Sequence, residues 1–318
     1  MKKSLIALAV LAASGAAMAQ SSVTLYGVAD IWFGQLDTGA TKTTRLDSGG
    51  LAGSRWGMKG SEDLGGGLKA NFKLEAGYKL DDGTATAGFS RVAQVGFSGG
   101  FGEVQVGKPW TALDDVLGAA NSGFDSALSA TNAVWVTPDN YISNPGNTIK
   151  YITPEMGGFS AAVSYSLDEV SATKADTTDF NVAYAGGPIT AAFAYQIAKN
   201  AGSLDTKFTT LNGSYDLGAA KLLASYANAK NLGGATNKTK EYQLGVDVPL
   251  SAAITLSAGY AQSKTDGGEK RTGYGIAAGY SLSKRTTMYA GIRDMEGKTS
   301  GVVTSEQSLY AVGVNHKF

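Results

Sequence analysis

The strongest constraint on the fold is a two-residue alternation of apolar and polar side chains that persists over long segments. In LKANFKLEAGYKL, from Leu68 to Leu80, every second position is apolar and the positions between carry mostly charged side chains. Successive side chains of a strand point to opposite faces, so the pattern predicts one long strand with an apolar and a charged face. It recurs in FSAAVSYSL (159–167), ITAAFAYQI (189–197), EYQLGVDV (241–248), ITLSAGYA (254–261) and GYGIAAGYSL (273–282).

The connections between these segments form a short and a long class that alternate along the chain. The short ones are 62–67, 98–102, 153–158, 185–188, 216–219, 249–253 and 281–286, and the long ones are 34–50, 81–89, 109–146, 169–177, 199–206, 230–239, 265–270 and 295–306. Seven turns and eight loops join sixteen strands. A soluble sandwich has shorter strands and does not sort its loops by length. The layout predicts an all-β, 16-stranded antiparallel transmembrane barrel with short periplasmic turns and long extracellular loops.

The first residues predict export. Lys2 and Lys3 precede the apolar run LIALAVLAA (5–13), and AMA (17–19) is a small-residue cleavage site. This order is typical of a secretory signal peptide, and the run is too short for the alternative, a membrane-anchoring helix. We therefore expect a signal peptide at 1–19 and a single barrel domain at 20–318.

Composition agrees with a strand-rich exported protein. The chain has 43 glycines, 15 tyrosines and 11 phenylalanines, but 6 prolines and no cysteine. Glycine suits tight turns and aromatic residues suit strands, while the absence of cysteine requires a fold without disulfides. The formal net charge is zero, which argues against a nucleic-acid partner.

Aromatic residues and the last segment support closure of the barrel. Tyrosines are assigned to outward positions, many near strand ends, where an interfacial girdle is expected. The final segment SLYAVGVNHKF alternates up to Phe318, and we expect it to pair with VTLYGVADIWF (23–33) at a seam. The outward tyrosines are Tyr26, Tyr165, Tyr195, Tyr226, Tyr260, Tyr280 and Tyr310.

Several segments together resemble the general trimeric porins of Gram-negative outer membranes. They are SSVTLYGVAD, SRWGMKGSEDLGGGLKANFKLE, SRVAQVGFSGGFGEVQVGK, NTIKY and LYAVGVNHKF. The resemblance implies a sixteen-stranded barrel, a homotrimer, and a third loop folded inward to narrow the pore. It also implies contact with outer-membrane lipid and lipopolysaccharide, and a C-terminal signal, Tyr310 and Phe318, read by the barrel-assembly machinery.

Basic side chains are predicted on one side of the constriction. Parity points Arg55 and Lys59 inward, together with Lys69, Lys73 and Lys79 on the next strand and Lys150 further on. By resemblance, Arg55 and Arg91 match two members of the family's basic ladder, and a further arginine is replaced by Asn144. Lys108 reaches the lumen only if its strand ends at Gly107. The predicted basic set is Arg55, Lys59, Lys73, Arg91, Lys108 and Lys150.

The acidic side is predicted to come from the long connection 109–146, by resemblance the constriction loop. Its acids include Asp114, Asp115, Asp125 and Asp139, and Asp125 fits the position of a constriction carboxylate in the family, while a nearby matching position holds Asn121. The alternative is an exposed surface loop with solvated charges. Opposed charged walls would orient polar solutes in the pore.

Catalysis is not indicated. His316 is the only histidine, so neither a histidine-containing metal motif nor a Ser-His-Asp arrangement can be assembled. GYGIAAG (273–279) lies within an alternating strand, not at the strand-to-helix turn of a dinucleotide site. We expect no catalytic residues, no metal and no cofactor.

The predicted function is passive diffusion of small hydrophilic solutes and ions across the outer membrane. A weak preference for anions is expected, because the wall strands carry more basic than acidic residues. Two alternatives stay open: a substrate-selective channel with a lumen binding site, and a barrel acting mainly as a surface adhesin or scaffold. Short loops argue against the last.

Overall fold

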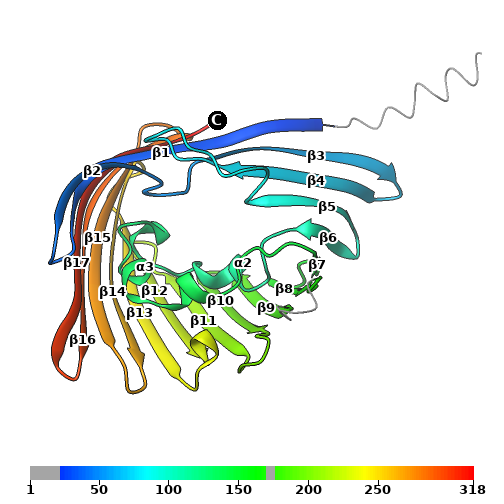
Figure 1. Cartoon of the computed structure of the whole chain (residues 1–318). Helices are drawn as coiled ribbons and strands as arrows, with labels where there is room; N and C mark the ends of the chain where they lie inside the picture. The colour runs from blue at the N-terminus through cyan, green and yellow to red at the C-terminus, as the bar shows by residue number, and fades with distance from the viewer. Residues whose placement is uncertain (1–21, 170–175) are drawn as a thin grey trace, which may run out of the picture.

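The structure, a computed structural model, describes residues 22–169 and 176–318, and the predicted signal peptide lies outside them. The described chain is almost entirely strand (Figure 1). The first nine strands are β1 (Ser22–Asp37), β2 (Lys42–Ser48), β3 (Arg55–Gly65), β4 (Leu68–Gly77), β5 (Val92–Gly99), β6 (Gly102–Lys108), β7 (Thr148–Ile152), β8 (Phe159–Ser166) and β9 (Thr177–Gly186). The others are β10 (Ile189–Ala198), β11 (Thr206–Asp216), β12 (Lys221–Lys230), β13 (Lys238–Pro249), β14 (Ile254–Thr265), β15 (Lys270–Ser281), β16 (Thr286–Thr299) and β17 (Val302–Lys317).

These segments close into one antiparallel barrel. From β3 onwards each strand pairs with the next, and β17 pairs with β1 over Val28–Asp37. Strands β2 and β3 occupy successive halves of the same edge of β1, facing Ile31–Asp37 and Ser22–Val28. The seventeen strands of the described chain therefore fill sixteen positions, which confirms the predicted count.

The seam is closed as the sequence predicts. The backbone N–H of Gly27 donates to Phe318 O at 3.0 Å, and the N–H of Phe318 donates to Gly27 O at 3.1 Å. A Cβ atom at Gly27 would lie 2.3 Å from the Phe318 ring. The aromatic ring thus packs across a position where only glycine leaves room, as in aromatic rescue of a strand glycine.

The two faces of the wall follow the predicted alternation. Outward side chains such as Leu25, Leu211 and Leu244 are 64%, 53% and 66% exposed. The prediction for Tyr26 is wrong, because its hydroxyl donates to the inward carboxylate of Glu75 at 2.9 Å. Tyr26 lies opposite Gly57 and on the parity of Asp30, which is buried on the inner side.

The connections also correct the sequence interpretation. Every second connection is a short turn, as predicted, for example the one between β9 and β10. The long loops expected at 34–50 and 295–306 are instead mostly strand: β1 and β2 meet at 38–41, and β16 and β17 at 300–301. Polar residues in these stretches extend paired strands beyond the apolar part of the wall.

The connection between β6 and β7, residues 109–147, is the longest in the described chain and lies inside the barrel (Figure 1). We call it the third loop. It contains the short helices α2 (Asp114–Leu117), η1 (Gly123–Asp125), α3 (Ala130–Val134) and α4 (Thr137–Asn140), while η2 (Leu232–Gly234) follows β12. No helix among the described residues is long and apolar enough to cross a membrane.

Candidate functional site

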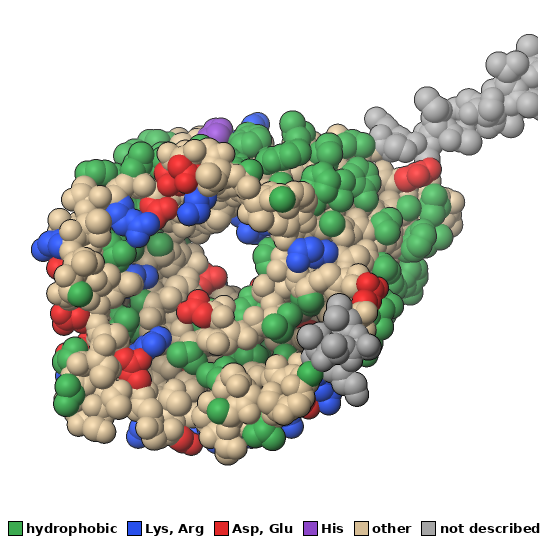
Figure 2. Space-filling model, in the orientation of Figure 1, with side chains coloured by type: hydrophobic (Ala, Val, Ile, Leu, Met, Phe, Trp, Pro, Cys, Tyr) green, Lys and Arg blue, Asp and Glu red, His purple; other side chains and the backbone are tan. Residues whose placement is uncertain are grey.

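An opening runs through the molecule beside the third loop. In Figure 2, Lys and Arg side chains lie along one edge of this opening, and Asp and Glu side chains lie across from them. The opening is bounded by the inner faces of β3–β5 on one side and by the third loop on the other (Figure 1). Its two walls therefore carry opposite charges.

The basic wall is organised around Glu75 of β4, whose side chain is 4% exposed. The Arg91 Nε donates to Glu75 Oε1 at 2.7 Å, and Arg55 Nε and Lys73 Nζ each lie 3.7 Å from Oε2. The Tyr26 hydroxyl donates to the same carboxylate. Three cations thus share one anion, so this cluster keeps a net positive charge.

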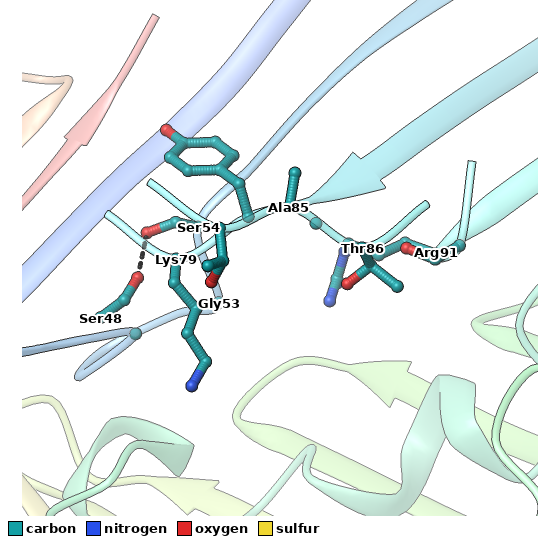
Figure 3. A pocket seen from close by; sticks show the side chains of 12 residues that line it. Ser48, Gly53, Ser54, Lys79, Ala85, Thr86 and Arg91 are labelled. Carbon is teal, nitrogen blue, oxygen red and sulfur yellow. Dashed lines mark hydrogen bonds between the residues drawn. The ribbon is translucent and has the colours of Figure 1, made fainter. Parts of the chain in front are cut away.

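A pocket opens in front of this cluster, with Lys79 and Arg91 in its lining (Figure 3). Both side chains extend into the same open space in that view. Arg91 stacks over the Trp110 ring at 5.1 Å, which fixes its guanidinium while leaving it partly exposed. The lining also includes Ser48, Ser54, Thr86 and Ser90.

The other predicted basic residues have different surroundings. Lys59 is exposed, and its ammonium lies 5.5 Å from the Tyr26 ring. Strand β6 continues through Lys108 instead of ending at Gly107, and the Lys108 ammonium donates to the carbonyl of Asn144. Lys108 therefore ties down the end of the third loop, which corrects its expected place in the open lumen.

Lys150 and Asp115 form an ion pair between the wall and the third loop. The Lys150 Nζ lies 2.6 Å from Asp115 Oδ2 and also donates to Trp110 O at 3.0 Å. The Lys150 side chain is 3% exposed and that of Asp115 is 33% exposed. Lys150 thus points inward as predicted, but its charge is covered and neutralised by the loop.

Asp114 and Asp125 of the third loop are held by neutral partners. The Tyr141 hydroxyl donates to Asp114, and Asn121 Nδ2 donates to Asp125 Oδ1 at 2.8 Å. Burial raises the pKa of Asp114 to about 6, even though the hydrogen bond from Tyr141 and the charge of Lys150 act in the opposite direction. Asp114 is therefore only partly ionised in mildly acidic solution.

Polar side chains of the wall hold the third loop by its backbone. Glu241 accepts from the N–H groups of Val136 at 2.5 Å and Thr137 at 3.3 Å. Asp179 accepts from the Leu113 N–H at 3.0 Å, and Gln196 pairs twice with Ile142. These bonds supply the partners that a buried loop backbone needs.

Apolar contacts complete this attachment. Leu113, Val116 and Leu117 pack on Ala192, Ala194, Phe208 and Ala229. Further along, Leu128 packs against Trp32 and Leu309. The loop backbone leaves no room for a side chain at Gly275, where a Cβ atom would lie 2.3 Å from Leu128 O. Small inward residues on β10–β15 thus make room for the loop.

Sequence reasoning missed Glu75 as the centre of the basic wall and Glu241 and Asp179 as loop anchors. Glu75 lies on the same face of its strand as Lys73, so its inward orientation could be predicted from the sequence. Its contacts with Tyr26 on β1 and Arg91 near β5 could not. The anchors carry no local signal, because their partners lie 66 to 105 residues away. No group of three or more potential metal ligands occurs in residues 22–169 and 176–318.

The fold and this site define a water-filled β-barrel channel. The chain matches the Gram-negative porin family model over residues 5–300, and it belongs to that family of outer-membrane diffusion channels. It is similar to outer membrane porin protein 32 of Delftia acidovorans, at 38% identity over 99% of this chain and 95% of the relative.

Two further comparisons agree. The chain is 29% identical to the major outer membrane protein P.IB of Neisseria lactamica, over 100% of both chains. The solved anion-selective porin from Comamonas acidovorans has a TM-score of 0.82 and 29% identity, covering 94% of this chain and all of that one. The likeness therefore covers the barrel and the third loop together.

Proposed function

We propose that this porin passes small hydrophilic solutes and ions with a weak preference for anions, and that Arg55, Lys73, Lys79 and Arg91 line the basic side of its constriction. Lys59 contributes further along the same wall. Asp114 and Asp125 form the acidic side. Asp115 contributes less, because Lys150 neutralises it.

The observation that carries this proposal is the unequal charge of the two walls. Three cations share Glu75, and Lys79 has no carboxylate within 4.0 Å among the described residues. On the loop, Asp115 is paired and burial raises the pKa of Asp114. The similarity to a porin described as anion-selective supports the same preference.

Reversal potential in a planar bilayer under a KCl gradient tests the proposal. Reversing the charge of Arg91 changes the local energy of a permeating ion by about 1.7 kcal/mol at ~5 Å in water, about 17-fold in relative permeability. Arg91→Glu and Arg55→Glu should therefore shift selectivity towards cations.

Arg285→Glu is the matched control, since Arg285 is exposed in the turn between β15 and β16, away from the Glu75 cluster. It should leave selectivity nearly unchanged. If neither Arg55→Glu nor Arg91→Glu moves the reversal potential, both residues lie outside the constriction. Linear conductance without saturation distinguishes general diffusion from a solute-specific channel.

We further propose export through a cleaved signal peptide at 1–19, assembly into a homotrimer, and recognition of Tyr310 and Phe318 by the barrel-assembly machinery. A trimer form of OmpT from Vibrio cholerae shares the fold at a TM-score of 0.73 and 18% identity. N-terminal sequencing of the mature protein and its mass in detergent test the first two points.

A further inference from the structure

The carboxylate of Asp30 on β1 is completely buried on the inner side of the wall. Three successive backbone N–H groups donate to it: Gly50 to Oδ1 at 2.7 Å, and Leu51 and Ala52 to Oδ2 at 3.1 Å each. These groups belong to residues 49–54, the connection between β2 and β3, which we call the bend. Hydrogen bonds to a carboxylate are stronger than those to a neutral acceptor, so Asp30 holds the bend firmly.

Two side chains of the wall share the same carboxylate. The Tyr289 hydroxyl on β16 donates to Oδ1, and Asn315 Nδ2 on β17 donates to Oδ2, each at 2.7 Å. No lysine or arginine nitrogen of the described ranges lies within 4.0 Å of Asp30. A buried carboxylate without a cation needs such donors. The carboxylate thus joins the bend to two other strands of the barrel.

The bend touches both walls of the opening. The N–H of Ala127 in the third loop donates to Gly50 O at 2.8 Å. Three residues further along the bend, Gly53 O accepts from Arg55 Nη1 of the basic wall at 2.9 Å. The bend is also pressed against the barrel, because a Cβ atom at Gly50 would lie 1.9 Å from the Tyr289 hydroxyl oxygen. The bend therefore lies between the third loop and the basic wall and contacts each of them.

The third loop at Ala127 is bound from two sides. Its N–H meets the bend, and its carbonyl accepts from Arg293 Nη1 on β16 at 2.9 Å. The next residue, Leu128, is fully buried and packs with Trp32 and Tyr289. The position of this part of the loop therefore depends on the bend as well as on its apolar contacts with the wall.

We propose that Asp30 is a positioning residue for the constriction. By fixing the bend, it sets how far the third loop at Ala127 stands from the basic wall at Arg55. Asp30 is itself fully buried, so it acts on the pore only through the bend. The proposal concerns the bore of the pore and not its ion preference, so its test is independent of the reversal-potential experiments above.

A single cysteine can test this arrangement, because the chain has none of its own. Leu128→Cys places a thiol where the side chain is fully buried, so a water-soluble maleimide reacts only when the loop leaves the wall. Asp30→Asn keeps the size of the side chain but turns an NH2 group towards some of the N–H donors. Loss of hydrogen bonds to a charged acceptor raises the released population, and hence the labelling rate of the folded mature protein in detergent, by about 30-fold.

The matched control is Asn315→Leu in the same Leu128→Cys protein. Asn315 donates to the same carboxylate but to no atom of the bend, so its loss lowers thermal stability without freeing the bend. The control should label like Leu128→Cys alone. An equal rise in both variants would reduce Asp30 to a general stabiliser of the barrel, and no rise in Asp30→Asn would also overturn the proposal.

Two measurements keep the proposal testable apart from the cysteine. Single-channel current through Asp30→Asn should switch between levels, and a steady current would show that the bend does not set the bore. In the unaltered mature protein, hydrogen–deuterium exchange at residues 50–52 should be slower than in the glycine turn 65–67. Equally fast exchange would show that Asp30 does not hold the bend, even if Asp30→Asn fails to fold.

Discussion

The inner wall of the barrel has two contrasting halves. On β3, on β4 and just before β5, charged inward side chains border open space, with Glu75 among three cations. On β8–β16 many are small, apolar or hydrogen-bonded to the third loop, which covers them. The outer surface shows the same apolar alternation in both halves.

The difference shows that alternation determines which side of a strand faces inward but not what that side touches. Inward residues that border water include charged side chains. Inward residues that border the third loop are often small, which leaves room for the loop backbone. Asp179 and Glu241 belong to the second kind, because they bind loop N–H groups and not ions. The pore is therefore asymmetric by construction.

The largest expected effect comes from filling the covered half. In Gly275→Val the new Cβ atom would lie 2.3 Å from Leu128 O, so the loop must move off the wall. Overpacking of this kind costs about 1–3 kcal/mol. Thermal unfolding in detergent should shift down, and single-channel conductance should fall, because the loop is pushed away from β15 and into the opening.

Ala278→Val is the matched control, since Ala278 lies three residues along β15 and faces outward. It should leave both stability and conductance close to those of the unaltered protein. Unchanged conductance in Gly275→Val would show that the loop does not set the bore.

The next largest expected effect concerns the charged half of the inner wall. Glu75→Gln removes the anion shared by Arg55, Lys73 and Arg91 but retains a group that can accept from Tyr26. One unit charge at ~6 Å in water is worth about 0.7 kcal/mol, about threefold in relative permeability. The reversal potential should move further towards anions, and a shift towards cations would contradict the shared-anion arrangement.

The smallest expected effect is a pH dependence on the loop side. Because the pKa of Asp114 is raised to about 6, lowering the pH from 7.5 to 5 neutralises its carboxylate. Loss of a negative charge at ~10 Å is worth about 0.4 kcal/mol, about twofold in favour of anions. Reversal potentials recorded at both pH values measure this change.

Asp114→Asn provides the comparison for this effect. At pH 7.5 it should behave like the unaltered protein at pH 5, and it should lose most of the pH dependence. A full pH response in Asp114→Asn would assign the titration to another loop carboxylate.

Much of the fold could be predicted from the sequence, because membrane strands obey a strict local rule. The strand expected at Leu68–Leu80 is observed as β4, Leu68–Gly77. The inward third loop was expected from its length and the family resemblance. Phe318 was assigned to the seam because its segment alternates up to the last residue.

The wrong predictions arose where side-chain orientation was inferred from parity alone, or loops from polarity alone. Tyr26 was read as a girdle residue, although its hydroxyl meets Glu75, which is 49 residues away. The polar stretches 34–50 and 295–306 were read as loops, because strand pairing beyond the membrane needs no apolar face. The environment of Lys108 and Lys150 depended on the path of the third loop, which no local pattern encodes.

The ring of Phe318 above Gly27 has a practical consequence for anyone handling this protein. A purification tag fused after Phe318 would begin where the Phe318 ring already fills the space beside Gly27 of β1. The added backbone would have to turn away from the barrel at once. The turn at 300–301, which is exposed and pairs with nothing beyond its own hairpin, is a better insertion point for a label.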